Sequence, residues 1–88
     1  MTDPNPDLWG DLSIAVVRSI LTDLMGGKVA RGPIAARAIA ATGCAAGTAT
    51  GLLSALGHLG VVDRAAKGKL RLTVLGRPWA ESWLEANP

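Results

Sequence analysis

The segment from Ala38 to Arg64, AIAATGCAAGTATGLLSALGHLGVVDR, decides the fold. Its first half is made of small residues, and the stretch Ala41–Gly51 has no charged or aromatic side chain. The dipeptide Thr42-Gly43 interrupts an Ala-rich helical pattern, and Gly60 ends a second one. The apolar residues of that second pattern recur at helical spacing: Leu52, Leu56 and Leu59, with Ala49 and Leu53. The segment therefore predicts a helix, a tight turn and a helix that ends near residue 59.

Two short extended segments follow, VVDR at 61–64 and KLRLTVL at 69–75. In the second, apolar residues alternate with polar ones, which is typical of a strand with one buried face. The expected inward residues are Leu70, Leu72 and Val74. Because Gly68 permits a tight tip, we expect an antiparallel hairpin over residues 61–75.

Helices are also expected before and after this core segment. Asn5-Pro6 is a favourable helix start, and Gly26-Gly27 a favourable end, which predicts a first helix over 6–25 after a flexible segment 1–5. Gly10 offers an alternative break, with Asp11 then as N-cap. Apolar residues recur every four positions: Leu8, Leu12, Val16, Ile20 and Leu24.

Proline residues mark two further helix starts. Pro33 is expected to open the second helix, so that residues 33–59 form a helix-turn-helix, and Pro78 opens a C-terminal helix over 77–87. The predicted fold class is mainly α with a small antiparallel β hairpin, in one domain over 1–88. This order of elements is that of a winged helix-turn-helix, with the hairpin as the wing.

Composition excludes several classes of function. The 88 residues include one cysteine, Cys44, and one histidine, His58, so no disulfide framework, zinc site or other metal cluster is expected. No catalytic constellation is present, and we expect neither an enzyme nor a cofactor. Residues 38–62 are uncharged and long enough to cross a bilayer. However, Gly, Thr and Ala contribute little to insertion, so we expect no membrane span and a cytoplasmic protein.

Charge is distributed unevenly along the chain. Residues 26–77 hold eight Lys and Arg side chains against one carboxylate, Asp63, whereas 1–25 and 78–88 are both net acidic. Such a basic middle favours a surface that faces a polyanion. Charges placed on solvated positions without a partner would give the same pattern.

The whole pattern resembles the winged helix-turn-helix domains of bacterial and archaeal regulators of the MarR, ArsR and IclR kind. Those domains have an Ala-rich helix, Thr-Gly, a helix ending in Leu-x-x-Leu-Gly-hydrophobic-Val-x-Arg, a Gly-containing wing and Leu-Thr-x-x-Gly. Here the corresponding segments are Ala38–Gly43, Leu56–Arg64, Lys67–Lys69 and Leu72–Gly76. The resemblance covers roughly residues 30–77 and implies that the third helix lies in the major groove of double-stranded DNA, with the wing on the backbone or in the minor groove.

On this basis the expected DNA-binding residues come from the second helix, the turn, the third helix and the wing. They are Arg31, Arg37, Thr42, Gly47, Thr48, Thr50, Gly51, Ser54, Arg64, Lys67, Lys69 and Arg71. The third helix offers no Arg, Lys, Asn or Gln to base edges, so recognition through DNA shape and phosphates is expected. Small residues four apart, Gly47, Gly51 and Ala55, also fit a close contact with a partner helix. A protein-interaction or dimerisation module without DNA binding is therefore the alternative function.

Three tryptophans are divided between the two ends of the chain. Trp79 and Trp83 lie one helical turn apart, and they fit either packing against Trp9 and the first helix or a dimer interface. We expect a homodimer through Leu8, Trp9, Leu12, Trp79 and Trp83, and no effector-binding domain is evident. Cys44 fits a buried structural cysteine, or an oxidant sensor at the turn.

Overall fold

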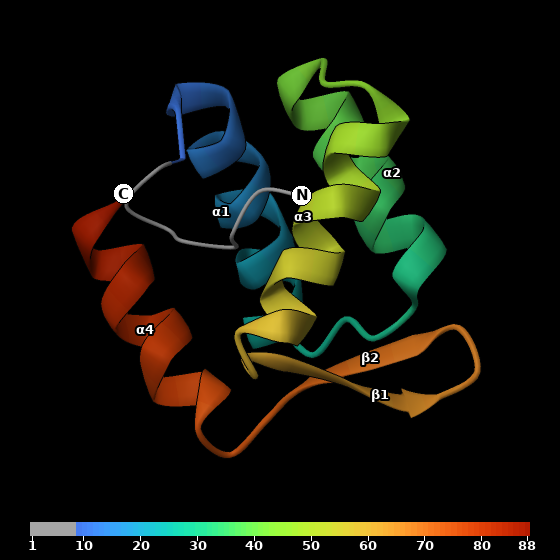
Figure 1. Ribbon diagram of the computed structural model, residues 1–88, viewed down its shortest axis with the longest axis vertical. Coiled ribbons are helices and arrows are strands. Elements are labelled where there is room, and N and C mark those ends of the chain that lie inside the picture. Colours follow the sequence, from blue (N-terminus) through green and yellow to red (C-terminus); the bar gives the residue numbers. More distant parts are fainter. Residues whose placement is uncertain (1–8) are drawn as a thin grey trace.

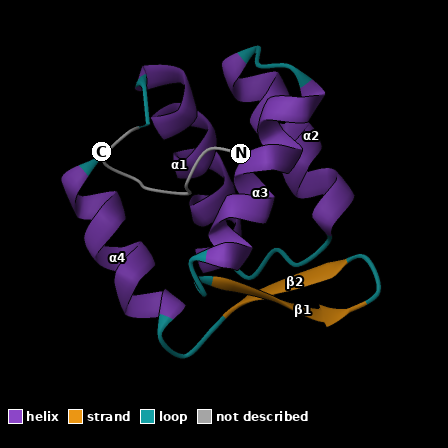
Figure 2. Cartoon of the chain, viewed as in Figure 1, coloured by secondary structure: helices purple, strands orange, loops and turns teal. Residues whose placement is uncertain are grey.

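The computed structural model describes residues 9–88, which form four helices and one two-stranded hairpin (Figures 1 and 2). The elements are α1 (Asp11–Met25), α2 (Arg31–Thr42), α3 (Ala46–His58), β1 (Val62–Ala66), β2 (Lys69–Leu72) and α4 (Gly76–Ala86). The predicted fold class, mainly α with a small antiparallel hairpin after the third helix, is confirmed. The expected flexible segment 1–5, the expected helix start at Asn5-Pro6 and the interface residue Leu8 lie outside the described residues.

Helix boundaries differ from the prediction at three starts. The first helix begins at Asp11 with Gly10 as its N-cap, so Asp11 is not the cap but lies in the first turn, where its carboxylate faces the positive end of the helix dipole. The second helix begins at Arg31, two residues before Pro33. Proline is tolerated there because the first N–H groups of a helix have no intrahelical acceptor. The last helix spans Gly76–Ala86 rather than 77–87.

The aliphatic core lies where α1 packs against α2, α3 and α4. Its largest fully buried side chains are Val16, Val17, Ile20, Leu21, Ile34 and Leu56. Each contributes about 1.5–3 kcal/mol by leaving water. The apolar residues expected to face inward are buried in the central turns of the first and third helices. Leu12 and Leu59, at the ends of these helices, are exposed. In the described residues, no helix is both long enough and apolar enough to cross a membrane.

The turn between α2 and α3 is closed by local hydrogen bonds. Gly43 adopts a left-handed conformation with φ 72°, which favours glycine. The hydroxyl of Thr42 donates to the carbonyl of Ala38 at 2.7 Å and accepts from the N–H of Cys44 at 3.3 Å. Cys44 is buried in the core, which agrees with the structural alternative for this residue. These contacts fix the start of α3 relative to α2.

The hairpin pairs Val62 with Leu72, Asp63 with Arg71 and Arg64 with Leu70, and a bulge follows Arg64. Gly68 stands at the tip with φ 72°, as expected for a tight turn. The strand β2 ends at Leu72, so the predicted extension to residue 75 is wrong. Val74, expected to face inward, is 92% exposed because the chain turns toward α4 after Leu72.

A short segment before α2 pairs with the other edge of the hairpin, which the sequence analysis did not foresee. Ala30 and Lys69 form an isolated antiparallel bridge. The N–H of Leu70 donates to the carbonyl of Val29 at 2.7 Å, and the N–H of Arg31 donates to the carbonyl of Gly68 at 2.9 Å. The hairpin is therefore held against the first residue of α2, across one end of the helices (Figure 1).

Thr73 joins the hairpin to the ends of α3 and α4. Its hydroxyl donates to the carbonyl of Gly60 at 2.6 Å and accepts from the N–H of Gly76 at 2.7 Å. Its own N–H donates to the carbonyl of Val61 at 3.0 Å. A Cβ at position 76 would collide with the carbonyl oxygen of Val61 and would lie 2.6 Å from its carbonyl carbon, so glycine is required there.

We expect Gly76→Ala to lower the free energy of unfolding by about 1–3 kcal/mol, because a backbone carbonyl must move to admit the methyl group. Urea unfolding followed by circular dichroism measures this. Gly32→Ala in α2 is the matched control, since nothing lies within 4 Å of the added Cβ. The control should be neutral or stabilising by up to about 1 kcal/mol. Equal stability of the two variants would contradict the assigned role of Gly76.

Candidate nucleic-acid interface

One face of α3 is exposed and almost free of charge. Its exposed residues are Gly47, Thr50, Gly51, Ser54 and His58, and Thr48 beside them is half-buried. A Cβ at Gly47 or Gly51 would have no neighbour within 4 Å. Glycine is therefore not required at either position by packing within the chain, although each costs the helix about 1 kcal/mol relative to Ala.

The polar groups on this face have little capacity to discriminate bases. The hydroxyl of Thr50 donates back to the carbonyls of Ala46 at 3.1 Å and Gly47 at 3.3 Å, a common arrangement for a threonine within a helix. Bidentate contacts to base edges come mainly from Arg, Lys, Asn and Gln. None of these occurs in Ala46–His58. The face of α3 therefore offers close backbone approach rather than a set of base-specific donors.

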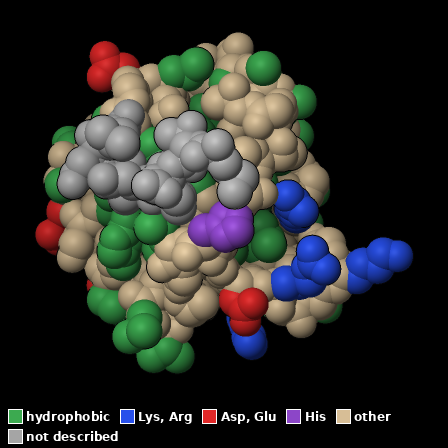
Figure 3. Space-filling model, in the orientation of Figure 1, with side chains coloured by type: hydrophobic (Ala, Val, Ile, Leu, Met, Phe, Trp, Pro, Cys, Tyr) green, Lys and Arg blue, Asp and Glu red, His purple; other side chains and the backbone are tan. Residues whose placement is uncertain are grey.

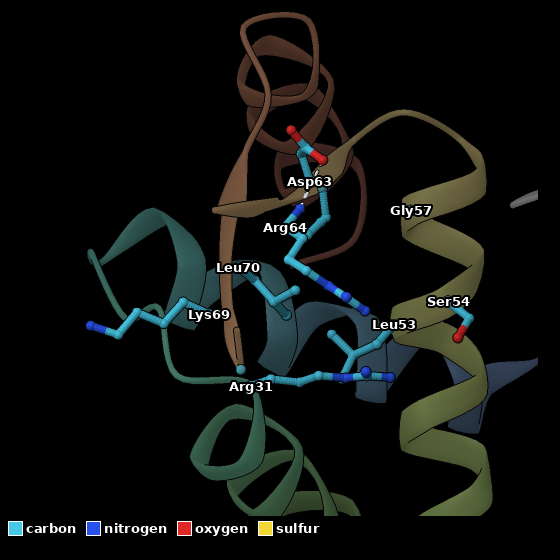
Figure 4. Close-up of a pocket in the computed structure, with 10 residues that line it drawn as sticks. Arg31, Leu53, Ser54, Gly57, Asp63, Arg64, Lys69 and Leu70 are labelled. Atoms are coloured by element: carbon cyan, nitrogen blue, oxygen red, sulfur yellow. Dashed lines mark hydrogen bonds between the residues drawn. The ribbon is translucent and has the colours of Figure 1, made fainter. Parts of the chain in front are cut away.

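The four expected wing cations are divided between two faces of the hairpin and its tip. Arg64 is paired with Leu70 and points toward α3, whereas Lys69 points away from it (Figure 4). Arg71 is opposite Asp63, and the two side chains form an exposed ion pair at 3.5 Å. Lys67 lies in the turn. Only Arg64 among them is directed at the third helix.

A groove with a volume of about 220 Å³ lies between α3, the hairpin and the start of α2. Arg64 enters it from β1, and Arg31 enters it from α2, on two sides of Leu53 (Figure 4). Ser54 lines it from the exposed face of α3. The groove thus connects the predicted recognition surface of α3 with the basic hairpin. Its two arginines were both predicted, but their convergence was not.

Two predicted DNA-binding residues have other contacts in the structure. The Nε of Arg37 donates to Oδ2 of Asp23 at 2.7 Å, and the side chain of Asp23 is only 17% exposed. Arg37 therefore joins α2 to the end of α1. Thr42 uses its hydroxyl inside the turn and lines a groove with residues of α1. Their expected part in DNA binding stays a prediction, and in the structure each is directed to a contact of α2 with α1 or with the turn.

Positive charge gathers over the hairpin in Figure 3, where the Lys and Arg side chains visible in this view lie on the side of the strands. The adjoining face carries a single histidine among uncharged side chains. Asp63 is the carboxylate of the hairpin, and its ion pair with Arg71 leaves the surface around Arg31, Arg64, Lys67 and Lys69 positive.

The tryptophans pack within the chain, which was one of the two expectations for them. Trp79 and Trp83 are stacked with ring centroids 6.4 Å apart, and Trp9 meets Trp83 edge to face at 6.3 Å. All three are half-buried against the core. Leu12, also expected in a dimer interface, is 50% exposed. The tryptophans thus form part of the contact between α4 and the start of α1.

Comparison with known protein families, with curated proteins and with solved structures gives no significant match to this chain. The features that bear on its function are therefore the exposed face of α3, the groove and the hairpin.

Proposed function

We propose that this protein binds double-stranded DNA as a small dimeric transcriptional regulator, without catalysis and without a cofactor. The observation that carries the proposal is the basic hairpin, which backbone hydrogen bonds to the start of α2 hold beside an exposed, uncharged face of α3. In the proposed complex α3 lies in the major groove, and the hairpin contacts the adjacent backbone or minor groove. The helix-turn-helix order, with a hairpin after the third helix, supports this arrangement.

Phosphate contacts supply most of the affinity in this proposal. Arg31, Arg64, Lys67 and Lys69 are cations on the hairpin side without a carboxylate partner in the described ion pairs, whereas Arg71 is paired with Asp63. Each phosphate neutralised releases counterions, so affinity falls with salt by about 0.9 log units per log unit for each contact. Sequence preference is modest and comes from the shape of the groove that α3 enters, since α3 has no bidentate donor.

Salt-dependent binding to a labelled mixed-sequence duplex, measured by fluorescence anisotropy, tests this proposal. Wild type should bind more weakly as salt rises. Lys67→Ala/Lys69→Ala should reduce the slope by about two, because two phosphate contacts are lost. Arg18→Ala is the control for loss of a positive charge away from the hairpin: it lies on α1, where its side chain donates to the carbonyl of Pro88 at 2.9 Å.

The control should leave the slope unchanged. Absence of binding at low salt would contradict the DNA proposal. The exposed face of α3, with Gly47 and Gly51, would then be tested as the contact surface of a protein-interaction module, the alternative function.

Substitution of Gly51 separates stability from binding. Gly51→Ala should raise the free energy of unfolding by up to about 1 kcal/mol, because alanine is the better helix former and the site is open. Gly51→Leu should fold equally well but bind the duplex at least about tenfold more weakly, because its side chain separates α3 from the base pairs. Thermal unfolding and anisotropy measure the two effects.

Ser82→Leu on the exposed side of α4 is the control for an added apolar side chain. It should leave DNA affinity unchanged. Full affinity of Gly51→Leu would show that this face does not enter the major groove.

Dimerisation is the second part of the proposal. The expected interface residues include Leu12, which is 50% exposed, and we add to them Val74 and Leu75, which precede α4 and are 92% and 82% exposed. Contact with a second copy would remove these apolar side chains from water. Sedimentation velocity should show a dimer of wild type, and Leu75→Glu should shift it to monomer without loss of helicity. Ala40→Glu, at an exposed position of α2, is the charge-matched control. A monomer of wild type at the highest soluble concentration would contradict the proposed dimer.

A further inference from the structure

Two arginines from distant parts of the chain enter the same groove. Arg31 is the first residue of α2, and its N–H is fixed by the carbonyl of Gly68 at 2.9 Å. Arg64 lies on β1, opposite Leu70, on the face of the hairpin directed at α3. Figure 4 shows both guanidinium groups extending toward α3, beside Leu53. The backbone pairing of the hairpin with the start of α2 is what brings them together.

No acidic partner balances these two charges in the described residues. The ion pairs there are Arg37–Asp23 and Arg71–Asp63. Asp63 also lines the groove, but its Oδ1 accepts from the N–H of Arg64 at 2.8 Å, and its Oδ2 faces Arg71. Two guanidinium groups thus share one concavity without a carboxylate between them. A site of this charge attracts an anion, and the field is focused by its low-dielectric walls.

The walls and the size of the groove indicate which kind of anion it can bind. Leu53 and Leu70 form apolar walls, which strengthen electrostatic contacts made in front of them. The volume of about 220 Å³ is several times the roughly 30 Å³ that one liquid water occupies, so the open groove has room for a tetrahedral oxyanion. Gly57 and Gly68 at the rim carry no side chain to block it.

We propose that this groove is a discrete phosphate-binding site, with Arg31 and Arg64 as its two guanidinium ligands. The planar fork of arginine matches phosphate oxygens in a bidentate manner, which lysine cannot reproduce. The phosphate comes either from the DNA backbone or from a small phosphorylated molecule. If the phosphate belongs to the DNA backbone, the inference rests on the proposed function. The site is then the contact through which α3 and the hairpin hold the same phosphate.

Titration of the isotopically labelled protein with inorganic phosphate, followed by two-dimensional NMR, tests the site without DNA. The Nε–H signals of Arg31 and Arg64 and the amide signals of Ser54 and Gly68 should shift together and saturate. Arg31→Ala and Arg64→Ala should each weaken the apparent affinity at least about tenfold. Arg64→Lys keeps the charge but should still weaken binding severalfold, because the fork is lost.

Arg18→Ala is the matched control, because it removes one guanidinium group from α1, where the side chain donates to the carbonyl of Pro88 and does not line the groove. It should change the affinity less than about twofold. An equal loss in Arg18→Ala and Arg64→Ala would overturn the proposal, since the net charge of the protein alone would then determine the affinity. Shifts that rise linearly with phosphate and never saturate would overturn it as well. Unchanged circular dichroism and signal dispersion of each variant show that the fold is intact.

Two further probes distinguish the source of the phosphate. Dimethyl phosphate represents the diester of the DNA backbone, and methyl phosphate represents a small monoester. Saturable shifts of the same signals with dimethyl phosphate support the backbone as the source, and shifts with methyl phosphate alone support a small molecule. Shifts with neither probe nor with inorganic phosphate, in a protein that binds the duplex, would overturn this inference and leave the proposed function standing. Saturable phosphate binding in a protein that does not bind the duplex would support the phosphate site and contradict the proposed DNA-binding function.

Discussion

The backbone pairing of Val29 and Arg31 with β2 is the constraint on which the candidate site depends. A two-stranded hairpin is marginally stable in water by itself. Here the carbonyl of Val29 and the N–H of Arg31 add hydrogen bonds along its second edge. That pairing sets the distance of the hairpin from α3 and places the first residue of α2 opposite Arg64. The groove, its charge and its orientation all follow from it.

Thr73 supplies the second anchor of the hairpin, through its bonds to Gly60 and Gly76. The Leu-Thr-x-x-Gly segment, on which part of the resemblance to winged regulators is based, thus has a structural explanation. Its threonine joins α3 to α4, and its glycine avoids the carbonyl of Val61. This motif indicates the fold, and a fold does not by itself imply a function. The functional proposal depends instead on the hairpin cations and on the open face of α3.

The two glycines on the exposed face of α3 lower the stability of the helix, and packing within the chain does not require them. Gly47 and Gly51 have open space around them, so the core gains nothing from their small size. A bare helix surface is compatible with close approach to DNA or to another helix, and the adjacent positive charge favours DNA. In the proposed complex, the hairpin and the start of α2 supply the positive charge, and α3 supplies the surface that fits the major groove.

The sequence by itself determined the elements whose cause is local. Helical spacing of apolar residues predicted the core helices, and Gly43 and Gly68 were predicted at turns because glycine accommodates positive φ. Both adopt φ 72° in the structure. Tertiary structure decided which cations act together. The sequence could not show that Arg37 would pair with Asp23 across two helices, or that Arg31 would meet Arg64. Those contacts depend on a non-local strand pairing and on which face of the hairpin meets α3, and neither leaves a periodic pattern in the chain.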